Sequence, residues 1–179
     1  MSDTPLPVYL DARKVFLNET TVNGSIEVEK LTRVAACTVD GRGKIRAQLS
    51  FSIDQAGRRR IRGSAQSRVL LTCQRCLEPV PAQLQEDLDL VLVDDEGSAQ
   101  LLDKQFEPWI AKDGRIVLAD LLDEQLLLGM PIVAIHDQGP CSEKSNYQTA
   151  NQSEEGQDRG EIGQNNPFAI LANYKVNDS

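Results

Sequence analysis

The stretch Lys44-Ile45-Arg46-Ala47-Gln48-Leu49-Ser50-Phe51-Ser52-Ile53 decides the fold, because polar and apolar residues alternate in it without interruption. A period of two predicts a β-strand with one buried face. Residues 54–57 have the composition of a turn, and a similar alternation resumes from Arg60 to Leu71. We therefore expect an antiparallel hairpin with its apolar side chains in the core and its polar side chains in solvent.

The polar face of this hairpin concentrates positive charge in a protein that is acidic overall. Residues 42–75 contain nine lysines and arginines and a single acid, Asp54, whereas the 179-residue chain has a net charge of −8. The hairpin would bring five cations to one surface: Lys44, Arg46, Arg60, Arg62 and Arg68. Such asymmetry is typical of a polyanion-binding face. Alternatively, these side chains pair with acids of the next alternating run, Leu84 to Val93, which contains Glu86, Asp87 and Asp89.

Aromatic residues are scarce and limit how this face can bind a nucleic acid. They make up 4% of the chain, and Phe51, the only one in the hairpin, is in phase with the apolar side chains. A platform that stacks unpaired bases needs exposed aromatic rings. We therefore expect contacts to phosphates or to a shaped RNA helix.

One main helix is predicted to pack on the sheet. Asp120 suits an N-cap, and Gly129 and Pro131 suit the end of the helix. The core-facing stripe comprises Leu118, Leu121, Leu122 and Leu126. Residues 106–111 and 115–117 flank a turn sequence and predict a second hairpin. We expect a single α+β domain over residues 1–141, with an antiparallel β-sheet or partly closed barrel and one main helix packed on it.

The C-terminal part has a different composition. Residues 142–166 are almost purely polar, which predicts a disordered linker. Residues 167–179 then form a short motif, and the order Asn-Pro at its start suits the first turn of a helix. Its apolar residues either dock back on the domain or bind a partner. The residues that we assign to partner binding are Asn166, Pro167, Phe168 and Leu171.

Several functional classes are excluded by residue content. The longest apolar runs are far shorter than the ~20 residues that span a membrane. No secretory leader is recognisable at the N-terminus, so we expect a soluble cytoplasmic protein. The chain has one histidine, His136, and lacks the glycine-rich phosphate loops of nucleotide enzymes. These features favour a binding protein that is not an enzyme.

Four residues have the chemistry of a metal site: Cys73, Cys76, His136 and Cys141. A Cys₃His set can bind Zn²⁺ tetrahedrally, and four protein ligands would make the ion structural. Sulfur atoms within about 4 Å of one another would favour zinc. Unliganded cysteines and a redox-active Cys-x-x-Cys pair remain as alternatives. The apolar neighbours of the fourth cysteine, Cys37, predict a buried thiol.

Three segments, taken together, resemble one family. They are Leu71-Thr72-Cys73-Gln74-Arg75-Cys76-Leu77-Glu78-Pro79, Met130-Pro131-Ile132-Val133-Ala134-Ile135-His136-Asp137 with Cys141 after it, and Asn166-Pro167-Phe168-Ala169-Ile170-Leu171. In this order they are similar to the YceD family, bacterial proteins named for large ribosomal RNA subunit accumulation. The resemblance implies a role in the synthesis, processing or stability of that RNA, and no established catalytic activity.

The charge pattern and the resemblance lead to one functional hypothesis. We predict a non-catalytic ribosome-biogenesis factor that binds large-subunit ribosomal RNA or a pre-ribosomal particle through the basic sheet face. The alternative is a protein–protein adaptor that acts on ribosomal RNA indirectly through its C-terminal motif.

Overall fold

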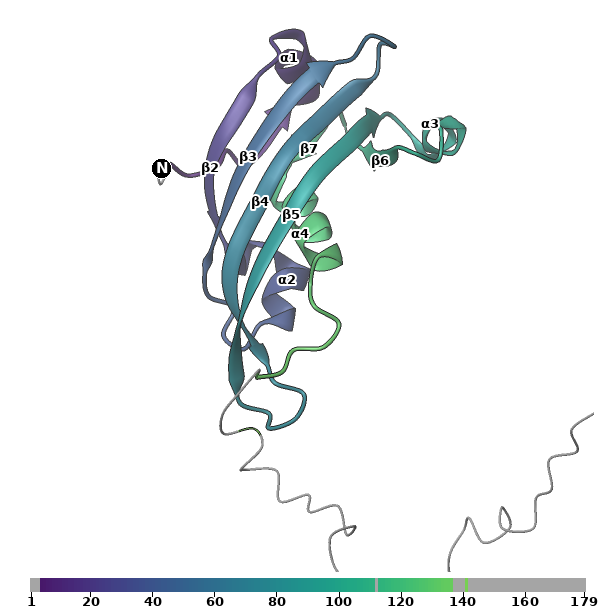
Figure 1. Ribbon diagram of the computed structural model, residues 1–179. Helices are drawn as coiled ribbons and strands as arrows, with labels where there is room; N and C mark the ends of the chain where they lie inside the picture. Colours follow the sequence, from purple (N-terminus) through teal and green to yellow (C-terminus); the bar gives the residue numbers. More distant parts are fainter. Residues whose placement is uncertain (1–3, 112, 137–140, 142–179) are drawn as a thin grey trace, which may run out of the picture. The chain divides into compact units, whose positions relative to one another are not determined.

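The computed structural model describes residues 4–111, 113–136 and 141, and every structural statement below concerns these residues. They form an α+β fold with a mostly antiparallel sheet, as predicted (Figure 1). In spatial order, its strands are β2 (Thr21–Glu27), β3 (Lys44–Ile53), β4 (Arg59–Thr72), β5 (Pro79–Val93) and β6 (Glu107–Ile110). β2 and β6 form its two edges, so the sheet does not close into a barrel. The predicted linker 142–166 and motif 167–179 lie outside the described residues.

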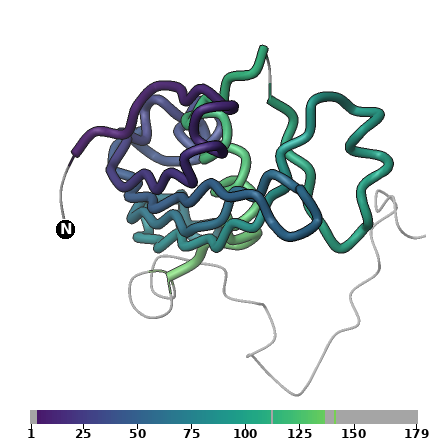
Figure 2. Tube along the Cα trace, turned by 90° about the horizontal axis from the view of Figure 1, so that it is seen from above, coloured from purple at the N-terminus to yellow at the C-terminus, as the bar shows by residue number. Residues whose placement is uncertain are grey.

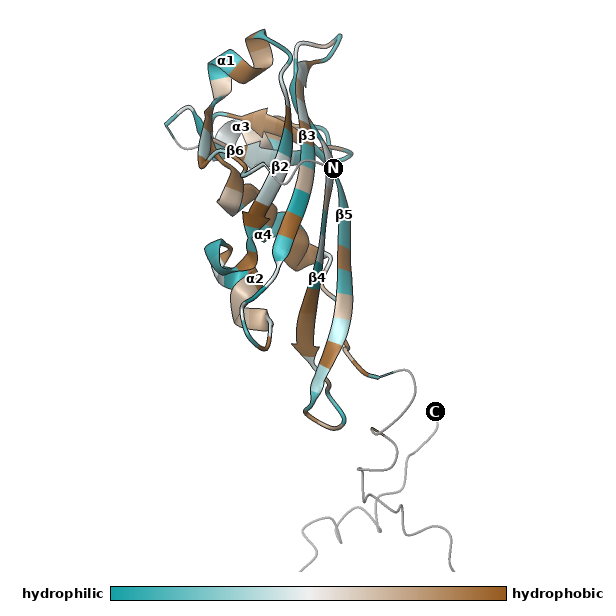
Figure 3. Ribbon diagram, turned by 90° about the vertical axis from the view of Figure 1, so that its left-hand side faces the viewer, coloured by the Kyte–Doolittle hydropathy of each residue, from teal (hydrophilic) through white to brown (hydrophobic). Residues whose placement is uncertain are grey.

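The hairpin of β3 and β4 confirms the alternation read from the sequence. The two strands pair antiparallel with Arg46 opposite Gln66 and Ser50 opposite Arg62. The carboxylate of Asp54 accepts hydrogen bonds from the N–H groups of Ala56 and Arg58, both at 2.9 Å, and thereby fixes the connecting turn. Most apolar side chains of the hairpin are buried, with Ile53 at the end of β3 and Leu70 of β4 as exposed exceptions. The hydrophilic and hydrophobic residues alternate as bands along β3 in Figure 3.

The apolar face of the sheet is covered by helices. The main helix, α4 (Leu118–Leu128), buries its predicted stripe completely, with Leu118, Leu121, Leu122 and Leu126 at 0% exposure. On the same side, α1 (Ala12–Leu17) places Phe16 edge-on against Phe51 of β3, at 5.6 Å between ring centroids. A short 3₁₀ turn (Val28–Lys30) leads into α2 (Thr32–Cys37), which packs against α4.

The N-terminal segment contributes a small second sheet. Its strand β1 (Tyr9–Asp11) pairs antiparallel with β7 (Arg115–Val117), the strand directly before α4. Figure 2 shows this segment lying to one side of the strands of the main sheet. The core is therefore a layer between the main sheet on one side and the helices and small sheet on the other.

The predicted hairpin over 106–117 is wrong, because β6 and β7 join different sheets. After β5, the chain passes through α3 (Glu96–Leu101), projects away from the sheet and returns, so that β6 runs parallel to β5. The end of β5, Val91 to Val93, is buried on both faces, which is typical of a strand with a parallel neighbour. The turn itself forms at Asp113 and Gly114, which both have positive φ.

Two local predictions are also wrong. Helix α4 begins at Leu118 with Val117 as N-cap, so Asp120 lies in the first turn instead of capping it. The pairing of β7 with β1 reaches as far as Val117, and the helix starts directly from that strand. Cys37 is exposed, because it is the last residue of α2 and lies beyond Val34, the residue that this helix buries.

Candidate functional sites

The first site is a loop between β4 and β5 that carries two cysteines. The Cys73 N–H donates to the Glu78 carbonyl at 2.9 Å, and the Leu77 N–H donates to the Cys73 carbonyl at 2.9 Å. Leu77 has a φ of 62°, a left-handed conformation that closes this tight loop. The fold of the loop brings Cys73 and Cys76 to the same side at the end of the sheet.

The segment after α4 is tied to this loop by hydrogen bonds. The Gln74 N–H donates to the Ala134 carbonyl at 2.9 Å, and the Gln74 side-chain amide donates to the Ile132 carbonyl at 3.1 Å. The Arg75 guanidinium donates to the His136 carbonyl at 2.8 Å. These contacts join positions about 60 residues apart and bring His136 to the two cysteines.

All four predicted metal ligands meet in one cluster. The ligand atoms of Cys73, Cys76, His136 and Cys141 all lie within 4.8 Å of one another. The Cys73 and Cys141 sulfur atoms are 3.4 Å apart, and Cys76 Sγ lies 3.5 Å from His136 Nδ1. On the other side of the ring, His136 Nε2 lies 3.1 Å from the Pro79 carbonyl oxygen. Nδ1 is thus the nitrogen that faces the sulfur atoms.

The surroundings of the cluster favour the deprotonated form of one thiol, that of Cys73. Burial acts to raise the pKa of the Cys73 thiol, but the N–H groups of Cys76, Arg75 and His136 and the Cys141 thiol outweigh it and lower that pKa to about 5. The pKa of the Cys141 thiol is raised by burial and by its hydrogen bonds with Cys73 and Cys76. Cys73 therefore carries a negative charge at neutral pH, as a metal ligand must.

The second site is the polar face of the sheet, where the five predicted cations lie in different environments. Arg60 is only 5% exposed, and its guanidinium pairs with Asp89 and lies 4.7 Å from the centre of the Phe106 ring. Arg62 Nε lies 3.0 Å from the same Asp89 carboxylate. The predicted alternative, pairing with acids of the next run, thus holds for these two arginines.

The pKa of the Asp89 carboxyl group depends on its two arginine partners, Arg60 and Arg62. Partial burial acts to raise the pKa of its carboxyl group, but the hydrogen bonds and positive charges of Arg60 and Arg62 lower that pKa below its ordinary value. At neutral pH Asp89 is ionised and neutralises part of the charge at this end of the sheet.

The other three cations line a shallow groove at the opposite end of β3 and β4. This feature, which we call the basic groove, has a volume of about 410 Å³ and is lined by Lys44, Arg46, Gln66, Ser67, Arg68 and Gln83. Among the described residues, Arg46 and Arg68 have no carboxylate within 4.0 Å, whereas Lys44 lies 3.8 Å from Glu27. Gln66 and Gln83 were not among the predicted binding residues, although Gln66 lies in phase with the cations of β4 and Gln83 pairs with Arg68.

The basic groove continues into a second hollow. This one has a volume of about 300 Å³, shares Arg46 and Gln66, and adds Asn23, Gln48 and Ser64 among its lining residues. The joined surface thus combines guanidinium groups with amides and hydroxyls, and none of its lining side chains is aromatic. The predicted partner-binding residues, Asn166, Pro167, Phe168 and Leu171, lie outside the described part of the chain.

Together these features define a class: a small α+β protein with an open sheet, one polar sheet face and a Cys₃His cluster at one end of the sheet. Residues 61–175 match the model of the family described as "Large ribosomal RNA subunit accumulation protein YceD", and the chain belongs to this family. The match includes the cysteine loop, His136, Cys141 and the C-terminal motif. The resemblance inferred from the three sequence segments is confirmed.

A relative from Haemophilus influenzae spans the same length. It is named large ribosomal RNA subunit accumulation protein YceD and is 28% identical over 177 residues, which covers 98% of this chain and 99% of the relative. No solved structure matches the chain. None of the helices in the described residues has the length and apolar character needed to cross a membrane.

Proposed function

We propose that this protein supports the accumulation of large-subunit ribosomal RNA by binding that RNA, or a particle that contains it, without catalysing a reaction. The family description and the name of the Haemophilus influenzae relative support the link to this RNA. The observation that carries the binding mode is the basic groove, where Arg46 and Arg68 have no carboxylate within ion-pair distance among the described residues.

The chemistry of the groove favours a structured RNA over an unpaired strand. Guanidinium groups bind phosphate oxygens, and neighbouring amides and hydroxyls can bind further phosphate oxygens or 2′-hydroxyl groups. A strand of unpaired bases would need aromatic rings for stacking, which the groove lacks. Arg60 and Arg62, engaged by Asp89, are expected to contribute less than the three cations of the groove.

Charge reversal in the groove tests this proposal. Segments of large-subunit ribosomal RNA are titrated with wild-type protein and with the Arg46→Glu/Arg68→Glu variant at several salt concentrations. Loss of two phosphate contacts should reduce the slope of log K against log salt by about 2. The matched control, Arg13→Glu/Lys104→Glu, makes the same change in net charge at exposed positions away from the groove. Equal affinities of the two variants would refute RNA binding through the groove.

The adaptor alternative has its own test. If the protein acts indirectly through residues 167–179, a chain that ends at residue 166 should fail to restore ribosomal RNA levels in cells that lack the protein. The same truncated chain should still bind RNA in solution with wild-type affinity. Restoration by the truncated chain would remove the alternative.

We further infer that the Cys₃His cluster binds a structural zinc ion. In a tetrahedron with zinc–sulfur bonds of ~2.3 Å, two sulfur atoms lie roughly 3.8 Å apart, close to the 3.4 Å between Cys73 and Cys141. The Pro79 carbonyl oxygen can accept a hydrogen bond from Nε2, the second ring nitrogen of His136, at 3.1 Å. Such a hydrogen bond is typical of metal-binding histidines. Four protein ligands leave no coordination position open for a substrate, which favours a structural role over a catalytic one.

Metal content tests this inference. Full-length protein purified from zinc-supplemented cells should carry about one zinc ion per chain, and Co²⁺ should give the absorption of a tetrahedral thiolate complex. Cys76→Ser should lose both signals, whereas Cys37→Ser, a change at the exposed cysteine outside the cluster, should keep them. If wild-type protein contains no more zinc than Cys76→Ser, the cluster is not a zinc site.

A further inference from the structure

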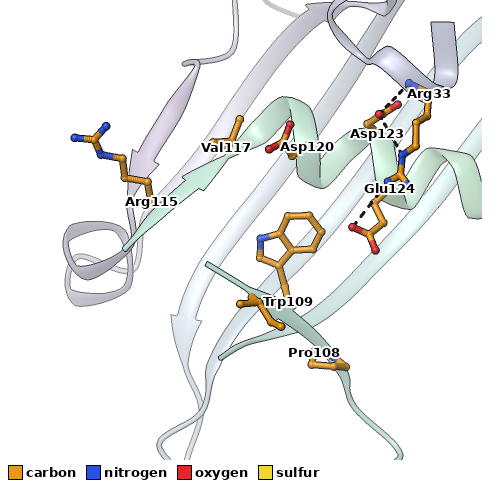
Figure 4. A pocket seen from close by; sticks show the side chains of 9 residues that line it. Arg33, Pro108, Trp109, Arg115, Val117, Asp120, Asp123 and Glu124 are labelled. Atoms are coloured by element: carbon orange, nitrogen blue, oxygen red, sulfur yellow. Dashed lines mark hydrogen bonds and ion pairs between the residues drawn. The ribbon is translucent and has the colours of Figure 1, made fainter. Parts of the chain in front are cut away.

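A third hollow lies on the helix-covered side of the sheet. It has a volume of about 500 Å³ and is bordered by α2, β6, β7 and α4. Trp109 of β6 stands in its centre and points towards α4 (Figure 4). Two residues earlier, Glu107 accepts a hydrogen bond from the Gln125 side chain of α4 at 3.0 Å, which fixes this face of β6 against the helix. We call this hollow the Trp109 pocket.

The charged side chains that line the Trp109 pocket are three acids and two arginines, so acids outnumber cations there by one. Asp123 is already engaged, because it accepts hydrogen bonds from the N–H groups of Arg33 and Val34 at 3.1 and 2.8 Å. Arg33 Nε also lies 3.5 Å from the Asp123 carboxylate, so the two side chains form an ion pair. Arg115 lies over the Tyr9 ring, and its guanidinium group is turned away from the Trp109 indole.

Two further carboxylates lie near the indole, and only one of them is engaged by Arg33. Asp120 is exposed and has no hydrogen bond or ion pair among the described residues. Glu124 follows one helical turn later and touches Arg33 only at 4.0 Å. An aromatic face flanked by two carboxylates binds a cationic side chain through cation–π attraction and charge.

The edge of the main sheet borders the same pocket. β6 pairs only with β5, and no other described strand lies along its second side. The Ala111 N–H donates to the Val93 carbonyl, so the peptide groups of the preceding residue, Ile110, point away from β5. Pro108, the other outward-facing residue of β6, has no N–H, so an extended peptide can pair through the Pro108 carbonyl and the N–H and carbonyl of Ile110, and place alternate side chains in the flanking pocket.

We propose that the Trp109 pocket binds an extended basic segment of a partner protein. One lysine or arginine side chain lies on the Trp109 indole between Asp120 and Glu124, and the backbone of the segment runs along β6. The carboxylates disfavour a phosphate ligand here. The pocket also lies on the opposite side of the sheet from the basic groove, so one molecule can contact an RNA and a basic protein together.

Trp109 is the only tryptophan of the chain, so its fluorescence reports directly on the pocket. Full-length protein is titrated with the blocked pentapeptide acetyl-Thr-Val-Arg-Val-Thr-amide and with the same peptide carrying norleucine in place of arginine. A saturable change with the arginine peptide and none with the norleucine peptide is expected. The absence of a saturable change with the arginine peptide would overturn the proposal.

Variants separate the pocket from general charge attraction. Asp120→Asn/Glu124→Gln should weaken binding of the arginine peptide at least about fivefold. The control Asp87→Asn/Glu19→Gln removes the same charge at exposed positions elsewhere and should leave affinity unchanged. Equal affinities of both variants would overturn the proposal.

A competition experiment distinguishes the second class of ligand. Ribosomal RNA segments that displace the peptide from the Arg46→Glu/Arg68→Glu variant would show that RNA occupies the Trp109 pocket, which also contradicts the proposal. The Asp120→Asn/Glu124→Gln variant should lose peptide affinity and keep RNA affinity. This result would show that the peptide site is separate from the RNA-binding face of the proposed function.

Discussion

The carboxylate of Asp123 joins two helices, and its removal tests how the helix layer is stabilised. Asp123 lies on α4 but accepts the N–H groups of Arg33 and Val34, in the first turn of α2. Helix α2 has no side-chain cap of its own, because its N-cap residue is Leu31. Asp123 is therefore an N-cap supplied from a distant part of the chain, 89 residues from Val34.

The cost of replacing Asp123 by alanine follows from these contacts. A hydrogen bond to a charged acceptor contributes roughly 1.5–3 kcal/mol, and loss of an N-cap costs about 0.5–2 kcal/mol. The ion pair with Arg33 adds little, because that side chain is 53% exposed. Both N–H groups lose their acceptor, and the Val34 contact is buried, so we expect the free energy of unfolding to fall by about 3 kcal/mol.

Urea unfolding followed by circular dichroism measures this difference. The Asp123→Ala midpoint should fall without a change in the denaturant slope, because the change removes contacts and leaves the area exposed on unfolding unaltered. Glu124→Ala, the neighbouring and exposed acid of α4, should change the free energy by no more than about 0.5 kcal/mol. Equal losses in the two variants would refute the capping role of Asp123.

Three further substitutions test other contacts. A Cβ at Gly63 would lie 1.9 Å from the Gln48 carbonyl oxygen, so Gly63→Ala should cost about 3 kcal/mol in urea unfolding, whereas the exposed Ser64→Ala should be nearly neutral. Leu77 is 76% exposed with a φ of 62°, so Leu77→Gly should raise the free energy of unfolding by about 0.5–1 kcal/mol; a loss would contradict strain there. The folded-state pKa of Asp89 lies below its ordinary value of 3.8, so its contribution to stability is present above that pH and disappears as pH falls through the folded-state pKa. Asp89→Asn should therefore reduce the dependence of unfolding free energy on pH below about 4, and an unchanged acid profile would refute it.

The sequence predicts the central hairpin well because burial there depends on local alternation alone. Along β3, each residue from Lys44 to Leu49 has the exposure that the period of two assigns to it. Both strands and their turn occur where the pattern places them. One face meets the helices and the other meets solvent over most of the length of the hairpin.

Arg60 shows where alternation alone is insufficient. It lies in phase with the exposed residues, yet the segment between β5 and β6 brings Phe106 over it. The unbroken apolar run Val91 to Val93 was the available signal, since side chains on both faces of that strand end had to be covered.

The cluster of Cys73, Cys76, His136 and Cys141 could be predicted because cysteine and histidine are rare here and have few other uses at a strand end. The prediction that these four residues lie together was correct, although 59 residues separate Cys76 from His136 in the sequence. The tertiary cap at Asp123 and the Trp109 pocket could not be predicted, because each depends on how β6 and α2 pack against α4. Periodicity in one segment contains no information about such packing.

The Cys₃His cluster at the end of the sheet joins distant positions of the chain, which affects the entropy of the unfolded state. Cys73 and Cys141 are 68 positions apart, and the enclosed stretch includes β5, α3, β6, β7 and α4. A permanent bond between the ends of such a loop lowers the entropy of the unfolded ensemble, by about 4 kcal/mol at 25 °C in the chain-entropy model. Any bridge formed at this point, by a metal or by oxidation, would restrain more than a third of the polypeptide in the unfolded state.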